Sequence, residues 1–174
     1  MKKKVLIISP HADDEILGCG GFISKYSDYN YQIHVLILTN ANKGAPELYS
    51  SDDIKFIRKE AEIANKLIGT KKIYFENLPA VNLNNYPVYR ISNVIDKYIK
   101  KIKPEIILIP SGNDIHDDHK IVHKAAKVSL RPNKTSNLKI ILSYEVLSET
   151  EWNEDGKSFN PNYFVHLKTK DIKK

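Results

Sequence analysis

Two short segments of the sequence carry most of the side chains that could do chemistry. Residues 11–15 read His-Ala-Asp-Asp-Glu, and residues 116–119 read His-Asp-Asp-His. Acids in the first turn of a helix also stabilise its dipole and cap free N–H groups, which accounts for the acids but not for the histidines. Zinc catalysis needs about three nitrogen or oxygen ligands and an open position for water. A histidine and an aspartate from the first segment and a histidine from the second would supply that set.

The adjacent carboxylates of Asp13 and Asp14 can divide two tasks between them. Neighbouring side chains point in different directions, so one can bind a metal while the other accepts a proton from a water molecule. Two further residues have ordinary explanations. We interpret His123 as an accident of an exposed helix face and Cys19 as a small buried residue. A single cysteine also excludes a disulfide scaffold and a cysteine-rich zinc module.

The chain around these residues alternates between strand and helix patterns. Short aliphatic runs followed by turn residues predict strands, and apolar residues at helical spacing predict helices. The predicted strands are Val5–Ser9, Ile33–Thr39, Ile73–Phe75, Glu105–Pro110, Leu138–Leu142 and Tyr163–Leu167. The predicted helices are Asp14–Tyr26, Ser51–Ile68, Val88–Lys101 and Asp118–Leu130. This alternation predicts an α/β fold, a Rossmann-like three-layer sandwich around a mostly parallel sheet.

The predicted fold brings the two chemical segments together. In open α/β sheets, ligands bind just beyond the carboxyl ends of the strands. Residues 10–15 follow one of the strongest strands, residues 40–44 follow a second, and residues 111–119 follow a third. The first and last of these loops hold most of the histidines, and we expect them to face each other.

Length and composition exclude several classes of protein. A chain of 174 residues suits one domain, since domains usually have about 100–200 residues. Its longest aliphatic runs are four residues, whereas a membrane span needs about 20 apolar residues. The apolar stretch after the lysines at residues 2–4 is also too short for a signal peptide. We therefore expect a soluble, cytoplasmic domain without a membrane span.

The net charge of +6 does not indicate nucleic acid binding. Only three of the 27 basic residues are arginines, Arg58, Arg90 and Arg131, and nucleic-acid-binding proteins use arginine for bidentate contacts. We interpret the lysines as a solvated surface that is compatible with attraction for an anionic small substrate. The sequence leaves the oligomeric state open and is compatible with a homo-oligomer.

Several motifs resemble those of the LmbE-like, or PIG-L, zinc-dependent N-acetylglucosaminyl de-N-acetylases. Residues 10–15 resemble the His-Pro-Asp-Asp-Glu signature of this family, with Ala12 in place of the usual proline, and residues 116–119 match its His-x-Asp-His signature. Residues 58–60 resemble its Arg-x-Glu helix, and residues 77–79 fit its Leu-Pro loop. Further likeness to the C-terminal part of the sugar-deacetylase branch lies in residues 144–146, 148–150 and 159–165. The resemblance implies an LmbE-like version of the predicted fold.

The resemblance implies a role for each matching residue. The ligands of a zinc ion would be His11, Asp14 and His119. Histidine and aspartate also suit Fe²⁺ or another divalent metal. Asp13 would be the general base, and His116 would face the developing oxyanion or act as an acid, with Asp118 hydrogen-bonded to it.

The implied activity is removal of the N-acetyl group from an N-acetylglucosamine-like amino sugar or glycoconjugate, with release of acetate. Arg58 would bind this small-molecule substrate or order the site. For Arg131, two explanations stay open from the residues alone: a cation that stabilises a helix C-terminus, or a contact to an anionic part of the substrate. We expect residues 1–174 to form a single deacetylase domain. Members of the family generally continue through another helix, whereas only a few residues follow Thr169.

Three other classes of protein stay open as alternatives. A non-catalytic sugar- or nucleotide-binding module on the same fold would not require the complete set of candidate catalytic residues. A dinucleotide-binding Rossmann enzyme would show Gly-x-Gly-x-x-Gly after the first strand, where His11 and the acids stand instead. A metallophosphatase with two metal ions would need more ligands than the sequence offers.

Overall fold

A five-stranded parallel sheet forms the middle layer of the structure, a computed structural model that describes residues 2–132, 137–147, 149–152 and 158–174. Its order is β3-β2-β1-β4-β5, and every neighbouring pair is parallel. The strands are β1 (Lys3–Ser9), β2 (Tyr31–Asn40), β3 (Lys72–Pro79), β4 (Ile106–Pro110) and β5 (Ile140–Tyr144). The predicted α/β fold with a mostly parallel sheet is therefore confirmed.

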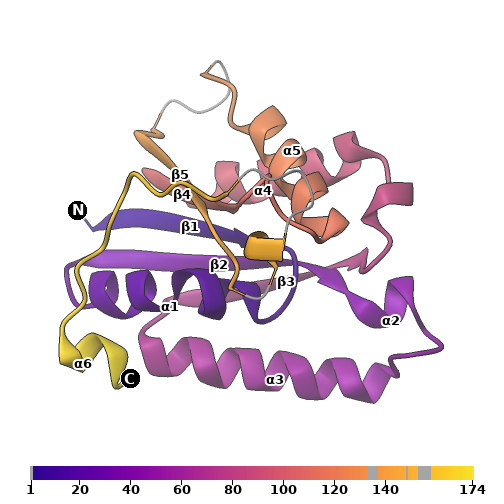
Figure 1. The fold of residues 1–174 in the computed structure, drawn as a ribbon, viewed down its shortest axis with the longest axis horizontal. Coiled ribbons are helices and arrows are strands. Elements are labelled where there is room, and N and C mark those ends of the chain that lie inside the picture. Colours follow the sequence, from indigo (N-terminus) through magenta and orange to yellow (C-terminus); the bar gives the residue numbers. More distant parts are fainter. Residues whose placement is uncertain (1, 133–136, 148, 153–157) are drawn as a thin grey trace.

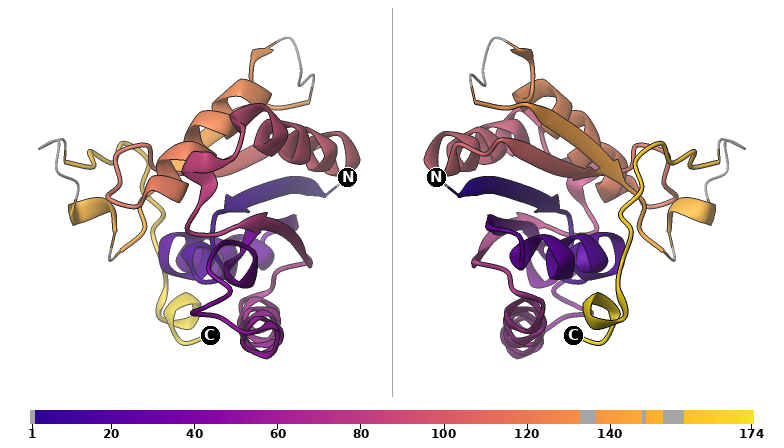
Figure 2. Two further views of the ribbon diagram at one scale, coloured as in Figure 1. Left: turned by 90° about the vertical axis from the view of Figure 1, so that its right-hand side faces the viewer. Right: turned by 90° about the vertical axis from the view of Figure 1, so that its left-hand side faces the viewer.

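Helices cover both faces of the sheet, which gives three layers (Figures 1 and 2). One face carries α1 (Asp14–Ser27) and α3 (Ser51–Ile68), and the other carries α4 (Val88–Ile102) and α5 (Asp117–Ser129). The short helical segments are α2 (Ala41–Gly44), η1 (Leu83–Asn85), η3 (Thr150–Trp152) and α6 (Thr169–Ile172). All four predicted long helices are present, with ends that differ by one residue at most from the predicted ones.

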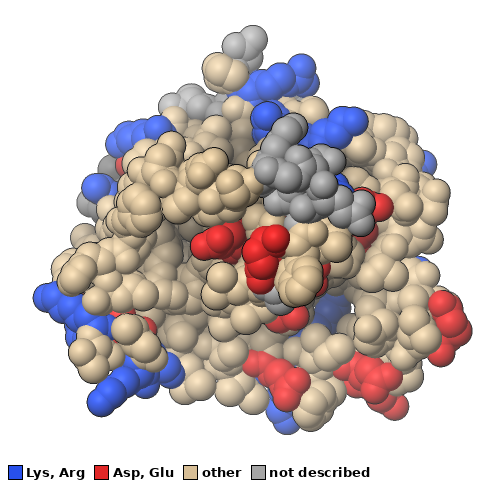
Figure 3. Space-filling view, viewed as in Figure 1, with Lys and Arg blue, Asp and Glu red and all other residues tan. Residues whose placement is uncertain are grey.

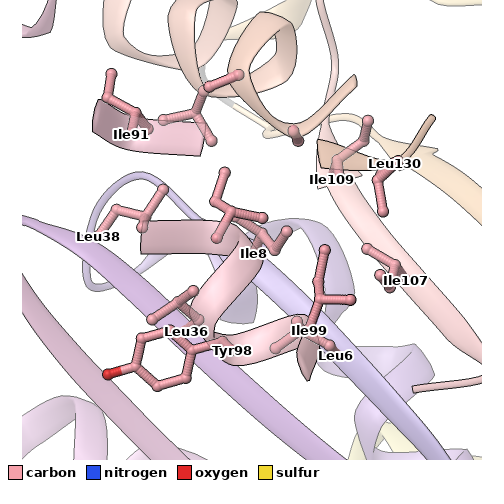
Figure 4. Packing of buried hydrophobic residues seen from close by; sticks show 14 of the residues in the cluster. Leu6, Ile8, Leu36, Leu38, Ile91, Tyr98, Ile99, Ile107, Ile109 and Leu130 are labelled. Carbon is pink, nitrogen blue, oxygen red and sulfur yellow. The ribbon is translucent and has the colours of Figure 1, made fainter. Parts of the chain in front are cut away.

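The β1 strand shows why the sheet is buried on both sides. Residues 5–8 are completely buried, and their side chains alternate between two separate hydrophobic cores. Leu6 and Ile8 pack with Ile91 and Ile99 of α4 (Figure 4), in a cluster that α5 completes, whereas Val5 and Ile7 pack with α1. A continuous apolar run suits a strand of this kind, because both of its faces meet helices.

Local sequence signals set the ends of α3. Ser50 and Asp53 form a capping box, in which each side chain accepts a hydrogen bond from the other residue's backbone N–H. The helix ends at Gly69, whose φ of +94° lies in the left-handed region that glycine adopts without strain. These two signals place α3 at the residues predicted from the sequence.

The prediction of a strand at Tyr163–Leu167 is wrong. This segment is an extended coil that lies along α1: Lys25 Nζ donates a hydrogen bond to the His166 carbonyl at 2.6 Å, and Leu167 lies against Gly21. Val165 packs on the same core as α1. Alternate apolar residues thus contact a helix layer, which produces the period-two pattern of a strand without any strand partner.

The topology brings the loops after β1 and β4 side by side. Strand β1 has β2 on one side and β4 on the other, so the direction of the strand order reverses between β1 and β4. Helix α1 starts after β1 and covers one face, and α5 starts after β4 and covers the opposite face. A crevice at this reversal point is the usual ligand site of open α/β sheets.

Two surface properties bear on the possible partners of the protein. Among the residues that the structure describes, no helix has the length and hydropathy to cross a membrane. Figure 3 shows acidic side chains near the middle and toward the lower right of one face, and lysine or arginine side chains in separate groups, mainly at the top and the left. On this face the basic residues therefore do not form one continuous patch, in agreement with the interpretation of a solvated lysine surface.

Candidate metal and catalytic site

Three side chains from the two loops converge on one point. His11 follows β1, Asp14 is the first residue of α1, and His119 lies in the first turn of α5. The distances are 3.4 Å from His11 Nδ1 to Asp14 Oδ2, 3.3 Å from His119 Nε2 to Asp14 Oδ2, and 3.3 Å from His119 Nε2 to His11 Nδ1. Ligands about 2.0–2.1 Å from a zinc ion in tetrahedral geometry lie about 3.3–3.4 Å apart. The three atoms therefore fit one face of a tetrahedral metal site.

Each imidazole of this triangle is held from behind by a buried carboxylate. Asp118 Oδ2 lies 3.1 Å from His11 Nε2, and Asp114 Oδ2 lies 3.0 Å from His119 Nδ1. Both aspartates are almost completely buried. Metal-binding histidines usually have such a partner on the nitrogen that faces away from the metal, because it fixes the orientation and tautomer of the ring.

Buried carboxylates also dominate the electrostatics of the cluster. Burial alone would lower the pKa of His11, but hydrogen bonds with Asp118 and Asp14 outweigh burial and raise that pKa to about 9. For His119 the same balance, with Asp114 and Asp14, gives a pKa of about 10. Burial alone would raise the pKa of Asp14, but the two imidazoles hold it well below its usual range. The space among the three side chains thus favours a positive charge, such as a divalent cation.

His116 lies next to this triangle and plays a structural part as well. Its ring centroid is 4.6 Å from that of His11 and 5.0 Å from that of His119. Its Nδ1 accepts a hydrogen bond from the Asp118 backbone N–H at 3.1 Å and so caps α5. The nitrogens of the three histidines lie within 4.8 Å of one another, so His116 is a second candidate ligand. The shorter distances to Asp14 favour the triangle that includes the carboxylate.

A cavity of about 350 Å³ opens beside the cluster. Its lining includes His11, Asp13, Asp14 and His116 from the two loops, and Arg58 from α3. Partial burial, together with the charge of Asp14, raises the pKa of the Asp13 carboxyl above its ordinary value. Asp13 precedes α1 but makes no side-chain capping hydrogen bond there, so the capping explanation for this acid does not hold.

Arg58 is held at the cavity by the end of β3. Its Nη2 donates to the Glu76 carbonyl at 2.6 Å and to Asn77 Oδ1 at 2.8 Å, and its guanidinium lies 5.0 Å from the centre of the Phe75 ring. Burial lowers its pKa, but an arginine stays charged at neutral pH. The remaining wall combines apolar residues such as Leu17 and Ile57 with polar ones.

The structure changes the interpretation of two predicted site residues. The Asp118 carboxylate contacts His11 and the backbone N–H of Leu83, not the side chain of His116. Arg131 lies beyond the C-terminal end of α5, where it lines a separate shallow hollow. A helix of 13 residues is about 20 Å long, so α5 separates Arg131 from the cluster at its N-terminal end.

Four further residues can be compared with their interpretation from the sequence. Cys19 is buried, as interpreted. His123 does not line the cavity, but the interpretation of an exposed helix face is wrong, because the side chain is half-buried and its Nδ1 lies 2.8 Å from the Pro110 carbonyl. Sequence reasoning missed Asp114, although its place two residues before His116 was a usable signal. It also assigned no role to Glu149, which lines the cavity from a segment about 30 residues farther along the chain.

The chain is similar to one protein family and to several known proteins. A family model described as PIG-L: GlcNAc-PI de-N-acetylase matches residues 6–130. A curated relative, the diacetylchitobiose deacetylase of Thermococcus kodakarensis, is 32% identical over 124 residues, which are 68% of this chain and 45% of the relative. The N,N'-diacetylchitobiose deacetylase of Pyrococcus horikoshii, solved with an inhibitor, has a TM-score of 0.77 and 26% identity, with coverage of 98% of this chain and 66% of that chain.

One relative has a different activity. The 4-oxalmesaconate hydratase of Pseudomonas putida is 23% identical over 141 residues, which are 72% of this chain and 51% of the relative. The chain thus spans about half the length of this hydratase and of the Thermococcus deacetylase. The family model, which matches residues 6–130, covers the part of the chain that holds the cluster. The reaction has to be inferred from the site itself.

Proposed function

Because the chain belongs to the PIG-L family of GlcNAc-PI de-N-acetylases, we propose that it is a metal-dependent hydrolase that removes the N-acetyl group from an N-acetylglucosamine-like amino sugar and releases acetate. The observation that carries this proposal is the triangle of His11 Nδ1, Asp14 Oδ2 and His119 Nε2, beside a cavity that Asp13 and His116 line. We further propose that residues 1–174 act as one deacetylase domain.

In this proposal His11, Asp14 and His119 hold the cation, with Zn²⁺ as the first candidate and Fe²⁺ as the second. When bound, the cation polarises the acyl oxygen and lowers the pKa of a nearby water molecule. The donor set supports either metal, since imidazole suits both zinc and iron.

Side chains of the protein transfer the protons and stabilise the developing charge. Asp13 accepts a proton from the water whose oxygen attacks the acetyl carbonyl carbon. His116 donates a hydrogen bond to the oxyanion that forms, an interaction whose loss costs about 10²–10³ in rate at comparable sites. The proton that Asp13 accepted then moves to the amine nitrogen as the C–N bond breaks, and the products are acetate and the free amino sugar. Arg58 binds polar groups of the sugar from the cavity wall.

The hydratase relative suggests a second reaction, the addition of water to an unsaturated acid. The described lining of the cavity favours the amino sugar. It contains one arginine or lysine, Arg58, beside two acids that are not in the ligand triangle, Asp13 and Glu149. A substrate with several carboxylates would meet these acids at short range, and like charges in a partly buried site are costly.

A non-catalytic sugar-binding module would need neither Asp13 nor the metal-binding triangle.

Metal analysis combined with acetate release tests the proposal. Purified protein is assayed on a panel of N-acetylglucosamine derivatives, before and after chelation, and on an unsaturated dicarboxylic acid as the hydratase substrate. We expect about one metal ion per chain and acetate release that a chelator abolishes and added zinc restores. A protein that binds no metal after reconstitution would overturn the hydrolase proposal, and hydration of the unsaturated acid without acetate release would replace it.

A further inference from the structure

The structure assigns a positioning role to a residue pair outside the ligand set. We propose that Asp114 fixes the imidazole of His119 for metal binding, and that Thr150, on the segment after β5, holds Asp114 in place. This inference rests on the proposed function, in which His119 is a metal ligand. The inference goes beyond that function, because it makes metal affinity depend on Asp114 and Thr150, which lie outside the two signature motifs at residues 10–15 and 116–119.

Asp114 is the meeting point of three hydrogen-bond donors. Its Oδ2 lies 3.0 Å from His119 Nδ1 and 2.9 Å from Thr150 Oγ1, and its Oδ1 accepts the His116 backbone N–H at 2.9 Å. The residue is 1% exposed. A buried carboxylate is stable only when such donors compensate for the loss of water.

The carboxylate determines which nitrogen of His119 faces the cluster. A carboxylate only accepts hydrogen bonds, so Nδ1 of His119 must carry the proton of this contact. The lone pair for a metal then belongs to Nε2, the atom that lies 3.3 Å from Asp14 Oδ2 and 3.3 Å from His11 Nδ1. Asp114 thus sets both the tautomer and the direction of the ring.

Thr150 connects this pair to the end of the sheet. Its hydroxyl oxygen accepts the Val146 backbone N–H at 2.8 Å, so its single proton is directed at Asp114 Oδ2. Thr150 is completely buried. A chain of hydrogen bonds therefore runs from Val146 through Thr150 and Asp114 to His119, and each bond polarises the next one in a medium of low dielectric constant.

An amide at position 114 cannot replace the carboxylate. Asparagine has one acceptor oxygen and one NH₂ group, whereas all three neighbours of Asp114 are donors. In either orientation the NH₂ group would face a donor from His116 or from His119 and Thr150. Asp114→Asn keeps the volume of the side chain but removes the support for His119.

Zinc affinity of four variants tests the inference, measured by competition with a chromophoric chelator. We expect Asp114→Asn to bind zinc about 10- to 100-fold more weakly than the wild type, the usual loss when a carboxylate behind a ligand is removed. Thr150→Val should lose affinity to a smaller extent, and Thr150→Ser, which keeps the hydroxyl, should bind like the wild type. The matched control is Asp117→Asn. Asp117 is an exposed acid in the first turn of α5, the turn that carries His119, and it pairs with Lys120 at 3.4 Å. This variant should leave the affinity unchanged.

The outcomes separate this inference from the proposed function. Wild-type affinity in Asp114→Asn, or an equal loss in Thr150→Ser and Thr150→Val, would overturn the positioning role while the metal site stands. If the wild type itself binds no zinc, the proposed function fails and the inference falls with it. If Asp114→Asn does not fold, as judged by thermal unfolding of the metal-free protein, the comparison of the two Thr150 variants decides.

Discussion

The carboxylate of Asp118 bonds to His11 across the sheet crevice, with 3.1 Å between Asp118 Oδ2 and His11 Nε2. Its other oxygen accepts the backbone N–H of Leu83 at 3.0 Å. One buried side chain from α5 thus connects the loop after β1 with η1. Asp118 and Asp114 have equivalent positions: each carboxylate contacts the imidazole nitrogen that faces away from the triangle, Asp118 on His11 and Asp114 on His119.

Substitution of Asp118 tests whether it acts through His11. We expect Asp118→Asn to weaken zinc binding about tenfold or more, because the amide is a poorer partner for the imidazole than the carboxylate. A role through His116 alone would instead lower the rate and leave zinc affinity unchanged. Asp118→Ala should also cost about 1–3 kcal/mol in the free energy of unfolding, because it leaves the buried Leu83 N–H without its acceptor. Urea denaturation of the metal-free protein measures this cost.

Substitution of Asp13 separates proton transfer from metal binding. Asp13 lines the cavity but is not part of the triangle of short distances. We therefore expect Asp13→Asn to lower kcat by about 10²–10⁴, the usual contribution of a general base, with the metal still bound. Metal analysis beside acetate release gives both readouts. A variant that keeps the full rate would remove Asp13 from the role of base.

Metal binding should stabilise the fold, because the three donors come from separate elements. Zinc at 100 times its dissociation constant stabilises the native state by about 2.7 kcal/mol. For a chain of this length that corresponds to a rise in Tm of about 5–10 °C. Differential scanning calorimetry with zinc and with a chelator measures the rise, and Asp14→Ala should abolish most of it. Equal Tm values with and without zinc would contradict a metal site at these residues.

Two arginines provide a matched pair for substrate binding. Arg58 lies in the cavity wall and is held by Glu76 and Asn77, whereas Arg131 lines a hollow at the far end of α5. We expect Arg58→Ala to raise KM about tenfold, since a hydrogen bond to a charged group contributes about 1.5–3 kcal/mol. Arg131→Ala should leave KM unchanged. A rise in KM for Arg131→Ala would restore the substrate-binding interpretation of that residue.

The sequence predicted the layers of the fold because the signals are local and strong. The strand at residues 5–8 is apolar throughout, and Ser50 and Gly69 mark the ends of α3. Once the strands are placed, the general rule for open α/β sheets locates the site at residues 11–15 and 116–119. The prediction of a strand at residues 163–167 was wrong, because packing on a helix and pairing in a sheet can produce the same alternation of apolar residues.

The contacts within the site were harder to predict, because they depend on directions in space. Asp118 and His116 are two residues apart, and side chains at that spacing in a helix do not face each other. The carboxylate therefore turns to His11, 107 positions away in the sequence. Thr150 is 36 positions from Asp114, and the resemblance of residues 148–150 to the family assigns it no role. The position of Arg131, by contrast, follows from the length of α5 and could have been derived from the helical rise.

Glycines in α1 give a last prediction, which links packing to the site. A Cβ at Gly18 would lie 2.6 Å from the Glu145 carbonyl oxygen and against the ring of Tyr144, whereas a Cβ at Gly20 would meet only Ile16 Cγ2 at 3.8 Å. We expect Gly20→Ala to stabilise the protein by up to about 1 kcal/mol through helix propensity. Gly18→Ala should destabilise it by about 1–3 kcal/mol, since the ring of the buried Tyr144 and the backbone of the half-buried Glu145 must move. Because residues 144–146 lead to Thr150, Gly18→Ala should also weaken zinc binding, and Gly20→Ala should not. Denaturant unfolding and zinc competition measure the two effects, and a loss of zinc affinity in Gly20→Ala equal to that in Gly18→Ala would show that the tight contact at Gly18 is not its cause.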